Sequence, residues 1–305
     1  MAQPQVPVPE HKLLESPNSR TIEIFDWSIT ASTNPISNAF ECDSLQATLG
    51  FPLPEMTFGN NFLTLEHKSP SWKYSFTTEG ALKAVKNGEL GPGDGGVKVG
   101  TDPSSAFMMP QTVPTKPYDW TYTTTYPGGL EPSDSEKAPG EGESVEFKWV
   151  AADPEDPSQA IPMAELTRPD PILFYAEIPL FEDELHDNGS SALLVRIRVM
   201  PGCFFILARF TLRVDNVLFR QFDTRIYHSF SSSPPLIIRE TSGWEAPYDR
   251  VKRLLPMRDD LTPLTDPSFI AKALTEMPPR LSQGEGGKTG WRALGTRREI
   301  TELAS

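Results

Sequence analysis

The stretch from Ile172 to His228 constrains the fold most, because apolar and polar residues alternate along it in successive runs. In the run that starts at Leu193, every second residue is apolar, and Arg196 and Arg198 fall on the opposite side. The run from Phe204 to Val214 repeats the pattern. A period of two is typical of an antiparallel strand with one buried side. This part of the chain is therefore predicted to form adjacent strands of one sheet.

Two short turn sequences separate these strands. Pro201-Gly202 and Asp215-Asn216 both favour tight turns, and Asn and Asp tolerate a positive φ. A two-residue loop at the second turn pairs Val214 with Val217, which places Arg220 opposite Thr211. The sequence thus predicts a meander of three strands with one apolar side. Its other side is predicted to carry arginines, with Arg196 and Arg198 two residues apart and Arg209 and Arg213 four apart. Arg220 is predicted to lie on this side with Arg209 and Arg213.

Composition predicts a compact core with long irregular segments, since only 38% of the residues are hydrophobic and the chain has 31 prolines and 21 glycines. The predicted fold class is mainly β (α+β), with antiparallel sheets, a few short helices and long irregular loops in a single domain. Residues 1–20 are predicted to be disordered, 21–255 to form the core with loops at 88–117 and 127–170, and 256–305 to be a largely disordered tail.

Local patterns outside the meander predict further elements of this core. The predicted strands are 21–30, 62–66, 72–76, 118–126, 145–151, 172–181 and 236–240. The predicted helices are 36–49, 78–85 and 248–255. Pro179 predicts an edge position or a bulge in its strand.

Charge is distributed unevenly along the chain. The net charge of −13 argues against nonspecific nucleic-acid binding. Residues 131–187 hold 16 acidic and three basic residues, whereas 188–255 hold ten basic and five acidic ones. One interpretation is that Glu182, Asp183, Glu184 and Asp187 neutralise nearby arginines. The alternative is an acidic flank beside a basic groove, which suits a partner of mixed charge.

Location and redox state are predicted from simple features. No apolar run reaches the roughly 18 residues that a membrane span needs, and the first residues lack the apolar centre of a signal peptide. Cys42 and Cys203 match no metal-binding spacing, so reduced thiols are expected. The expected location is the cytoplasm, with the nucleus as an additional one.

Enzymatic motifs are absent from the sequence, and no cofactor or metal is predicted. Gly284–Thr289 (GEGGKT) has the ending of a phosphate-binding loop but has Ser282 where the first glycine is needed. Glu182, Glu184 and His186 alternate, with Asp183 and Asp187 beside them, and such a group can bind a divalent ion. A metal-dependent hydrolase that uses this cluster is the alternative function, and a solvated acidic turn is the simpler interpretation.

Aromatic residues line one side of the strand predicted at 118–126. Tyr118, Trp120 and Tyr122 alternate there with Asp119 and Thr121. They fit either core packing or a groove for a peptide. Asp223, Arg225 and Tyr227 also share one side of their strand, where pairing of arginine with aspartate within the sheet is the simpler interpretation.

Several long segments, in order, resemble the TIPRL family of TOR signalling pathway regulator-like proteins. They are Leu53–Asn61 (LPEMTFGNN), Lys116–Thr124 (KPYDWTYTT), Leu180–Gly189 (LFEDELHDNG), Arg196–Pro201 (RIRVMP) and Asp223–His228 (DTRIYH). The resemblance covers roughly residues 20–255. Within the family, the chain resembles a fungal-type member.

The resemblance implies a regulator that is not an enzyme. Members of the family bind catalytic subunits of type 2A-family protein phosphatases, engage the C-terminal tail of the phosphatase and restrain its activity. In fungi the family acts in TOR nutrient signalling and contacts the alpha-four-type phosphatase adaptor. A scaffold without any effect on phosphatase activity is a further alternative.

Arginine side chains suit this implied partner, because guanidinium groups bind carboxylates bidentately and a phosphatase tail offers carboxylates. We therefore expect a partner-binding site and no catalytic one. The expected site residues are Tyr118, Asp119, Trp120, Tyr122, Arg196, Arg198, Arg209, Arg213, Arg220, Asp223, Arg225 and Tyr227.

Overall fold

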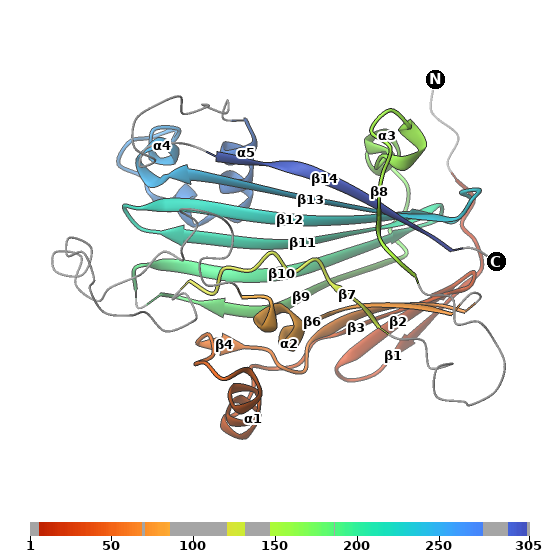
Figure 1. Ribbon diagram of the computed structural model, residues 1–305, viewed down its shortest axis with the longest axis horizontal. Coiled ribbons are helices and arrows are strands. Elements are labelled where there is room, and N and C mark those ends of the chain that lie inside the picture. The colour runs from red at the N-terminus through yellow and green to blue at the C-terminus, as the bar shows by residue number, and fades with distance from the viewer. Residues whose placement is uncertain are drawn as a thin grey trace.

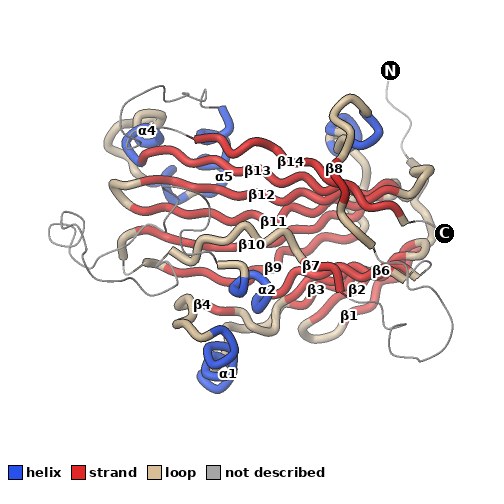
Figure 2. Tube along the Cα trace, viewed as in Figure 1, coloured by secondary structure: helices blue, strands red, loops and turns tan. Residues whose placement is uncertain are grey.

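Antiparallel strands dominate the structure and form two sheets (Figures 1 and 2). The computed structural model describes residues 6–68, 71–85, 121–131, 147–185, 187–276 and 292–303. A 6-stranded sheet has the order β1-β2-β3-β5-β6-β7, and an 8-stranded sheet has the order β4-β9-β10-β11-β12-β13-β14-β8. This confirms the predicted mainly β class with antiparallel sheets.

The smaller sheet consists of β1 (His11–Glu15), β2 (Ser19–Ile24), β3 (Trp27–Ser32), β5 (Phe62–His67), β6 (Trp72–Thr77) and β7 (Gly129–Glu131). The larger sheet consists of β4 (Met56–Thr57), β8 (Val150–Ala151), β9 (Phe174–Asp183), β10 (Gly189–Met200), β11 (Cys203–Val214), β12 (Leu218–Ser229), β13 (Leu236–Pro247) and β14 (Arg292–Glu302). The helices are α1 (Ala39–Leu49), α2 (Thr78–Lys83), α3 (Met163–Leu166), α4 (Tyr248–Lys252) and α5 (Pro267–Glu276), with 3-10 turns at Pro157–Gln159 and Thr262–Thr265.

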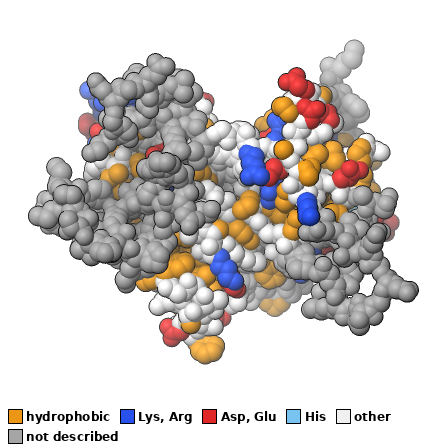
Figure 3. Space-filling model, in the orientation of Figure 1, with side chains coloured by type: hydrophobic (Ala, Val, Ile, Leu, Met, Phe, Trp, Pro, Cys, Tyr) orange, Lys and Arg blue, Asp and Glu red, His pale blue; other side chains and the backbone are white. Residues whose placement is uncertain are grey.

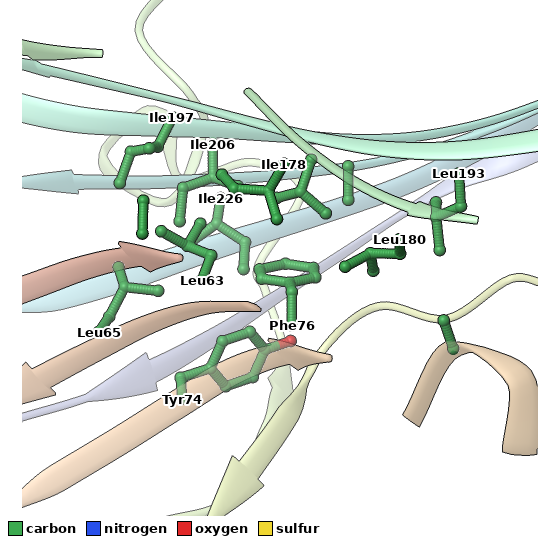
Figure 4. Close-up of a cluster of buried hydrophobic side chains, with 14 of the residues drawn as sticks. Leu63, Leu65, Tyr74, Phe76, Ile178, Leu180, Leu193, Ile197, Ile206 and Ile226 are labelled. Atoms are coloured by element: carbon green, nitrogen blue, oxygen red, sulfur yellow. The ribbon is translucent and has the colours of Figure 1, made fainter. Parts of the chain in front are cut away.

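The core lies between the two sheets (Figure 4). Leu63 and Phe76 of the smaller sheet pack there with Ile197 and Ile206 of the larger one. In β10 and β11 buried residues alternate with half-buried ones along almost the whole strand, as the sequence predicts. We call the side of the larger sheet that packs on the smaller sheet its inner face, and the opposite side its outer face.

The connection between β11 and β12 differs by one residue from the prediction. Val214 pairs with Leu218 and not with Val217, so the loop has three residues, and Asn216 adopts a φ of 61°. Arg220 therefore lies opposite Leu212. Because side chains alternate sides along a strand, this shift of one residue moves Arg220 to the inner face, away from Arg209 and Arg213.

The segment predicted as one strand, 21–30, is instead a hairpin. β2 and β3 pair with each other, and Phe25 takes a φ of 52° at the turn between them. Reversal at this point lets both Ile24 and Trp27 face the core. The sequence did not reveal this reversal, because the turn consists of Phe25 and Asp26 and contains no glycine.

Both predictions of disorder at the chain ends fail for the described residues. His11–Glu15 forms β1, which pairs with β2 within the segment predicted to be disordered. In the C-terminal segment, α5 packs through Ile270 and Leu274 against Phe219, and β14 pairs along β13. Long-range pairing with an existing sheet edge orders these polar segments, which their local composition could not reveal.

Several other predicted elements are present. α1 and α2 lie within the predicted helices, and the strands predicted at 62–66, 72–76, 172–181 and 236–240 are found. β9 has its irregularity between Pro179 and Phe181, as expected for this proline. Of the strand predicted at 145–151, only Val150–Ala151 is a strand among the described residues. The loop predicted at 88–117 lies outside the described residues, and 127–170 contains β7, β8 and α3.

None of the helices in the described ranges is long and apolar enough to cross a membrane.

Candidate functional site

Arg209, Asp223 and Arg225 form one network on the outer face. Arg209 donates to the two carboxylate oxygens of Asp223 over 2.7 and 2.8 Å, and Arg225 donates to its Oδ2 over 2.8 Å. Gln221 gives a further hydrogen bond of 3.1 Å to the same oxygen. These two arginines thus find their counter-charge within the chain at Asp223 and not in the acidic turn at 182–187, and the single carboxylate offsets one of the two positive charges.

The other predicted arginines lie apart from this network. Arg196 pairs with Glu177 over 3.0 Å at the surface, and Arg213 lies 3.0 Å from the carboxylate of Asp215. Arg198 makes no hydrogen bond or ion pair with the described residues. The predicted arginine row is therefore a set of separate contacts.

Arg220 is buried on the inner face, where it donates to Glu245 over 2.8 Å and to Thr123 over 3.1 Å. A burial of this kind is tolerated because the guanidinium group is both paired and hydrogen-bonded. Arg220 thus ties β12 to the segment 121–127 and is not accessible on the predicted site.

Tyr122 and Tyr227 are buried structural residues. The Tyr122 hydroxyl donates to the carbonyl of Leu53 over 3.0 Å. The Tyr227 hydroxyl donates to Glu165 over 2.6 Å and so ties β12 to α3. Burial raises the pKa of Tyr227 far above its usual value, with a further contribution from Glu165. Tyr118, Asp119 and Trp120 lie outside the described residues.

The acidic turn after β9 is held by backbone contacts. The Asp183 carboxylate accepts the N–H of Leu185 over 2.7 Å and that of Glu55 over 3.0 Å. Within the described ranges no group of three His, Cys, Asp or Glu side chains could hold a metal ion. His186 lies outside these ranges. The arrangement of Asp183 supports the simpler interpretation of this cluster as a structural turn.

Both cysteines are free thiols in the structure. Burial raises the pKa of Cys203 to about 11. Its thiol therefore stays protonated near neutral pH and is a poor nucleophile.

A cavity of about 370 Å³ opens on the inner face, beyond the part that the smaller sheet covers. Its walls come from β12, β13 and β14 on one side and from the segment 125–127 on the other. Figure 3 shows basic side chains beside acidic ones over this part of the larger sheet. The lining includes Tyr126, Thr224, Arg239, Thr241, Arg297 and Glu299.

Arg239 is the most constrained charged group of this cavity. Its guanidinium donates twice to Glu299 Oε2, over 2.7 and 3.1 Å, and once to the Tyr74 hydroxyl over 3.2 Å. It also lies 4.0 Å from the centre of the Trp149 ring, as expected for a cation–π contact. Burial raises the pKa of Tyr74, although Arg239 opposes this effect, so the hydroxyl remains a neutral donor and acceptor.

Arg297 gives the cavity an accessible positive charge. It pairs with the second oxygen of Glu299, Oε1, while 74% of its side chain stays exposed. One carboxylate thus serves two guanidinium groups, which leaves these three residues with a net positive charge. An anionic group such as a carboxylate is the ligand that this arrangement favours.

The sequence prediction missed Arg239, Arg297 and Glu299. Arg239 follows the apolar residues Leu236–Ile238, and an arginine in such a run needs a buried partner. That signal could have singled out Arg239. The partner, Glu299, lies 60 residues further along the chain, in the segment predicted to be disordered.

Comparison with known proteins identifies the family. Residues 56–252, about two thirds of the chain, match the TIP41-like family. The chain belongs to the TIP41-like family. A TIP41-like protein of Dictyostelium discoideum is 35% identical over 272 residues, which cover 87% of this chain and 90% of that protein. This confirms the family that the sequence motifs indicated.

Two further TIP41-like relatives extend the comparison to animals and fungi. The TIP41-like protein of Homo sapiens is 36% identical over 253 residues, 81% of this chain and 83% of that protein. The type 2A phosphatase activator TIP41 of Saccharomyces cerevisiae is 35% identical over 275 residues, 83% of this chain and 71% of that protein. The name activator is inconsistent with the inhibition that the resemblance implied.

Proposed function

We propose that this TIP41-like protein is a non-enzymatic regulator that binds the catalytic subunit of a type 2A-family phosphatase. The name of the yeast relative, a type 2A phosphatase activator, supports a phosphatase as the partner. The cavity on the inner face supports a way of binding it. In this proposal the cavity takes the C-terminal tail of the phosphatase, and a carboxylate of the tail meets Arg297.

The single observation that carries this proposal is the charge of the cavity. Arg239 and Arg297 share Glu299, and Arg297 remains largely exposed. A charge-assisted hydrogen bond from a guanidinium to a carboxylate is worth about 1.5–3 kcal/mol where the bound tail covers it, and less where it stays exposed. Tyr126 and Pro127 on the opposite wall offer apolar surface to the residues before that carboxylate.

The proposal is tested by pull-down with a purified type 2A catalytic subunit, with and without its C-terminal tail. Arg297→Gln removes the charge and keeps most of the side chain, and we expect it to weaken binding by about tenfold. Arg258→Gln is the matched control, because Arg258 is exposed and makes no hydrogen bond or ion pair with the described residues. Tail-independent binding would keep the phosphatase as partner but exclude this cavity.

The effect on the phosphatase is a separate question, which an assay of the catalytic subunit with and without the protein answers. We propose that activity changes on binding, and the sign of the change separates activation from inhibition. Unchanged activity in the bound complex would leave the scaffold as the function. Action in TOR signalling, contact with the alpha-four-type adaptor and a cytoplasmic or nuclear location remain proposals that rest on the family resemblance.

A further inference from the structure

On the outer face of the larger sheet, Asp223 is buried between two more exposed arginines, while Glu177 beside Arg196 stays exposed. The Asp223 side chain is 0% exposed, whereas those of Arg209 and Arg225 are 16% and 24% exposed. The carboxylate therefore lies beneath the two guanidinium groups. Although the charges partly cancel, a partner that approaches the Arg209–Asp223–Arg225 network meets its positive groups first.

Arg196 and Arg198 add to this positive surface from the neighbouring strand β10. They are two residues apart on one strand, so their side chains leave the sheet about 7 Å apart on the same side. Arg196 is 36% exposed and pairs with Glu177, whereas Arg198 pairs with none of the described residues. A guanidinium without a partner among the described residues is available to an external anion.

Apolar side chains lie between these arginines. Leu207 is opposite Arg196, Phe205 is opposite Arg198, and all these side chains are partly exposed. The ends of the outer face are covered, by α3 at one end and by α4 and α5 at the other. What remains open is a mixed surface of arginine and large apolar groups, a composition enriched at the centres of protein interfaces.

We propose that this open part of the outer face, which comprises Arg196, Arg198, Phe205 and Leu207, binds an acidic, extended segment of a protein partner. Carboxylates on alternate residues of an extended segment repeat about every 7 Å, which matches the spacing of Arg196 and Arg198. The net charge of −13 opposes any anionic partner, and it opposes nucleic acid or an anionic membrane most, because these carry a denser negative charge than a segment with carboxylates on alternate residues. The site lies on the opposite side of the sheet from the cavity, so both can be occupied together.

A fluorescence anisotropy titration of the full chain tests this proposal. The probe is a labelled synthetic peptide that alternates Glu with Leu, and the matched probe has Gln in place of Glu. We expect the Glu peptide to bind, the Gln peptide to bind at least about tenfold more weakly, and added salt to weaken the Glu peptide. Arg198→Glu should reduce affinity for the Glu peptide by about tenfold or more.

Lys272→Glu on α5 is the control variant, because it changes the net charge equally at an exposed residue of the same protein. Near-wild-type binding by this variant supports the proposal. An equal loss in both variants would mean a general charge effect and would overturn it, as would unchanged binding by Arg198→Glu. A single-stranded RNA probe that binds better than the Glu peptide and is lost in Arg198→Glu would also overturn the choice of partner.

Discussion

At the scale of single residues, the arginines of this chain differ mainly in whether their ion pairs are buried or exposed. Asp223 accepts hydrogen bonds from Arg209, Gln221 and Arg225, and its carboxylate has no contact with solvent. Removing one partner of such a buried pair leaves the remaining charge uncompensated. Arg196 and Glu177, in contrast, pair in the open, where water compensates either group.

We therefore expect Asp223→Ala to lower the free energy of unfolding by about 3 kcal/mol, because Arg209 and Arg225 lose their common partner in a partly buried place. Glu177→Ala, which breaks the exposed pair with Arg196, should cost less than about 1 kcal/mol. Denaturant unfolding monitored by tryptophan fluorescence measures both. Similar losses of unfolding free energy in the two variants would show that the Asp223 network contributes no more to stability than an exposed ion pair.

At the scale of elements, β14 extends the larger sheet beyond β13 and completes the cavity. It pairs with β13 over most of its length, and it supplies Glu299 to Arg239. Without β14, Arg239 would be a largely buried cation without a carboxylate. The strand lies beyond residues 56–252, which match the family, so this wall of the cavity comes from outside the matched segment.

A chain that ends at Glu276 should therefore be less stable than the full chain. An uncompensated Arg239 costs about 3 kcal/mol, which corresponds to a fall in the midpoint of thermal unfolding of roughly 5 °C for a chain of this size. Adding Arg239→Met to the truncated chain should recover part of this loss, because the substitution removes the unpaired charge. Calorimetry measures both changes, and no recovery would mean that the lost strand pairing alone accounts for the effect.

At the scale of the whole molecule, an aromatic cluster joins the two sheets. His228 of the larger sheet lies with its ring centre 4.9 Å from that of Trp27 in the smaller sheet and 5.3 Å from that of Phe204. Its Nδ1 is 2.9 Å from the carbonyl oxygen of Leu236. Burial lowers the pKa of His228 to about 4, so this contact between the sheets requires a neutral imidazole.

The stability of the fold should consequently fall in mild acid. Between the usual pKa of 6.5 and the lowered value of about 4, the unfolded chain takes up a proton that the folded chain does not. The His228 contribution is complete above this window and is lost as the pH falls through it, by about 2 kcal/mol at about pH 5. Unfolding free energies across this window should fall less steeply for His228→Gln, and an identical slope would contradict the assignment.

Sequence alone determined the central sheet. Alternation along β10 and β11 specifies which side is buried, because the side-chain period of a strand is two wherever the strand occurs. The helices α1 and α2 and the irregularity at Pro179 followed from equally local chemistry. The family could also be read from motifs, since these are contiguous in the chain.

The candidate functional surface depends on tertiary contacts. The loop has three residues instead of two, which places Arg220 on the inner face of the sheet, and no local signal fixed that length. The cavity depends on Arg239 meeting Glu299, which are 60 residues apart, and on β14, whose polar sequence acquires its order from pairing with β13. Local propensity specifies elements, whereas the choice between a buried pair and an open binding group depends on which distant residues the fold brings together.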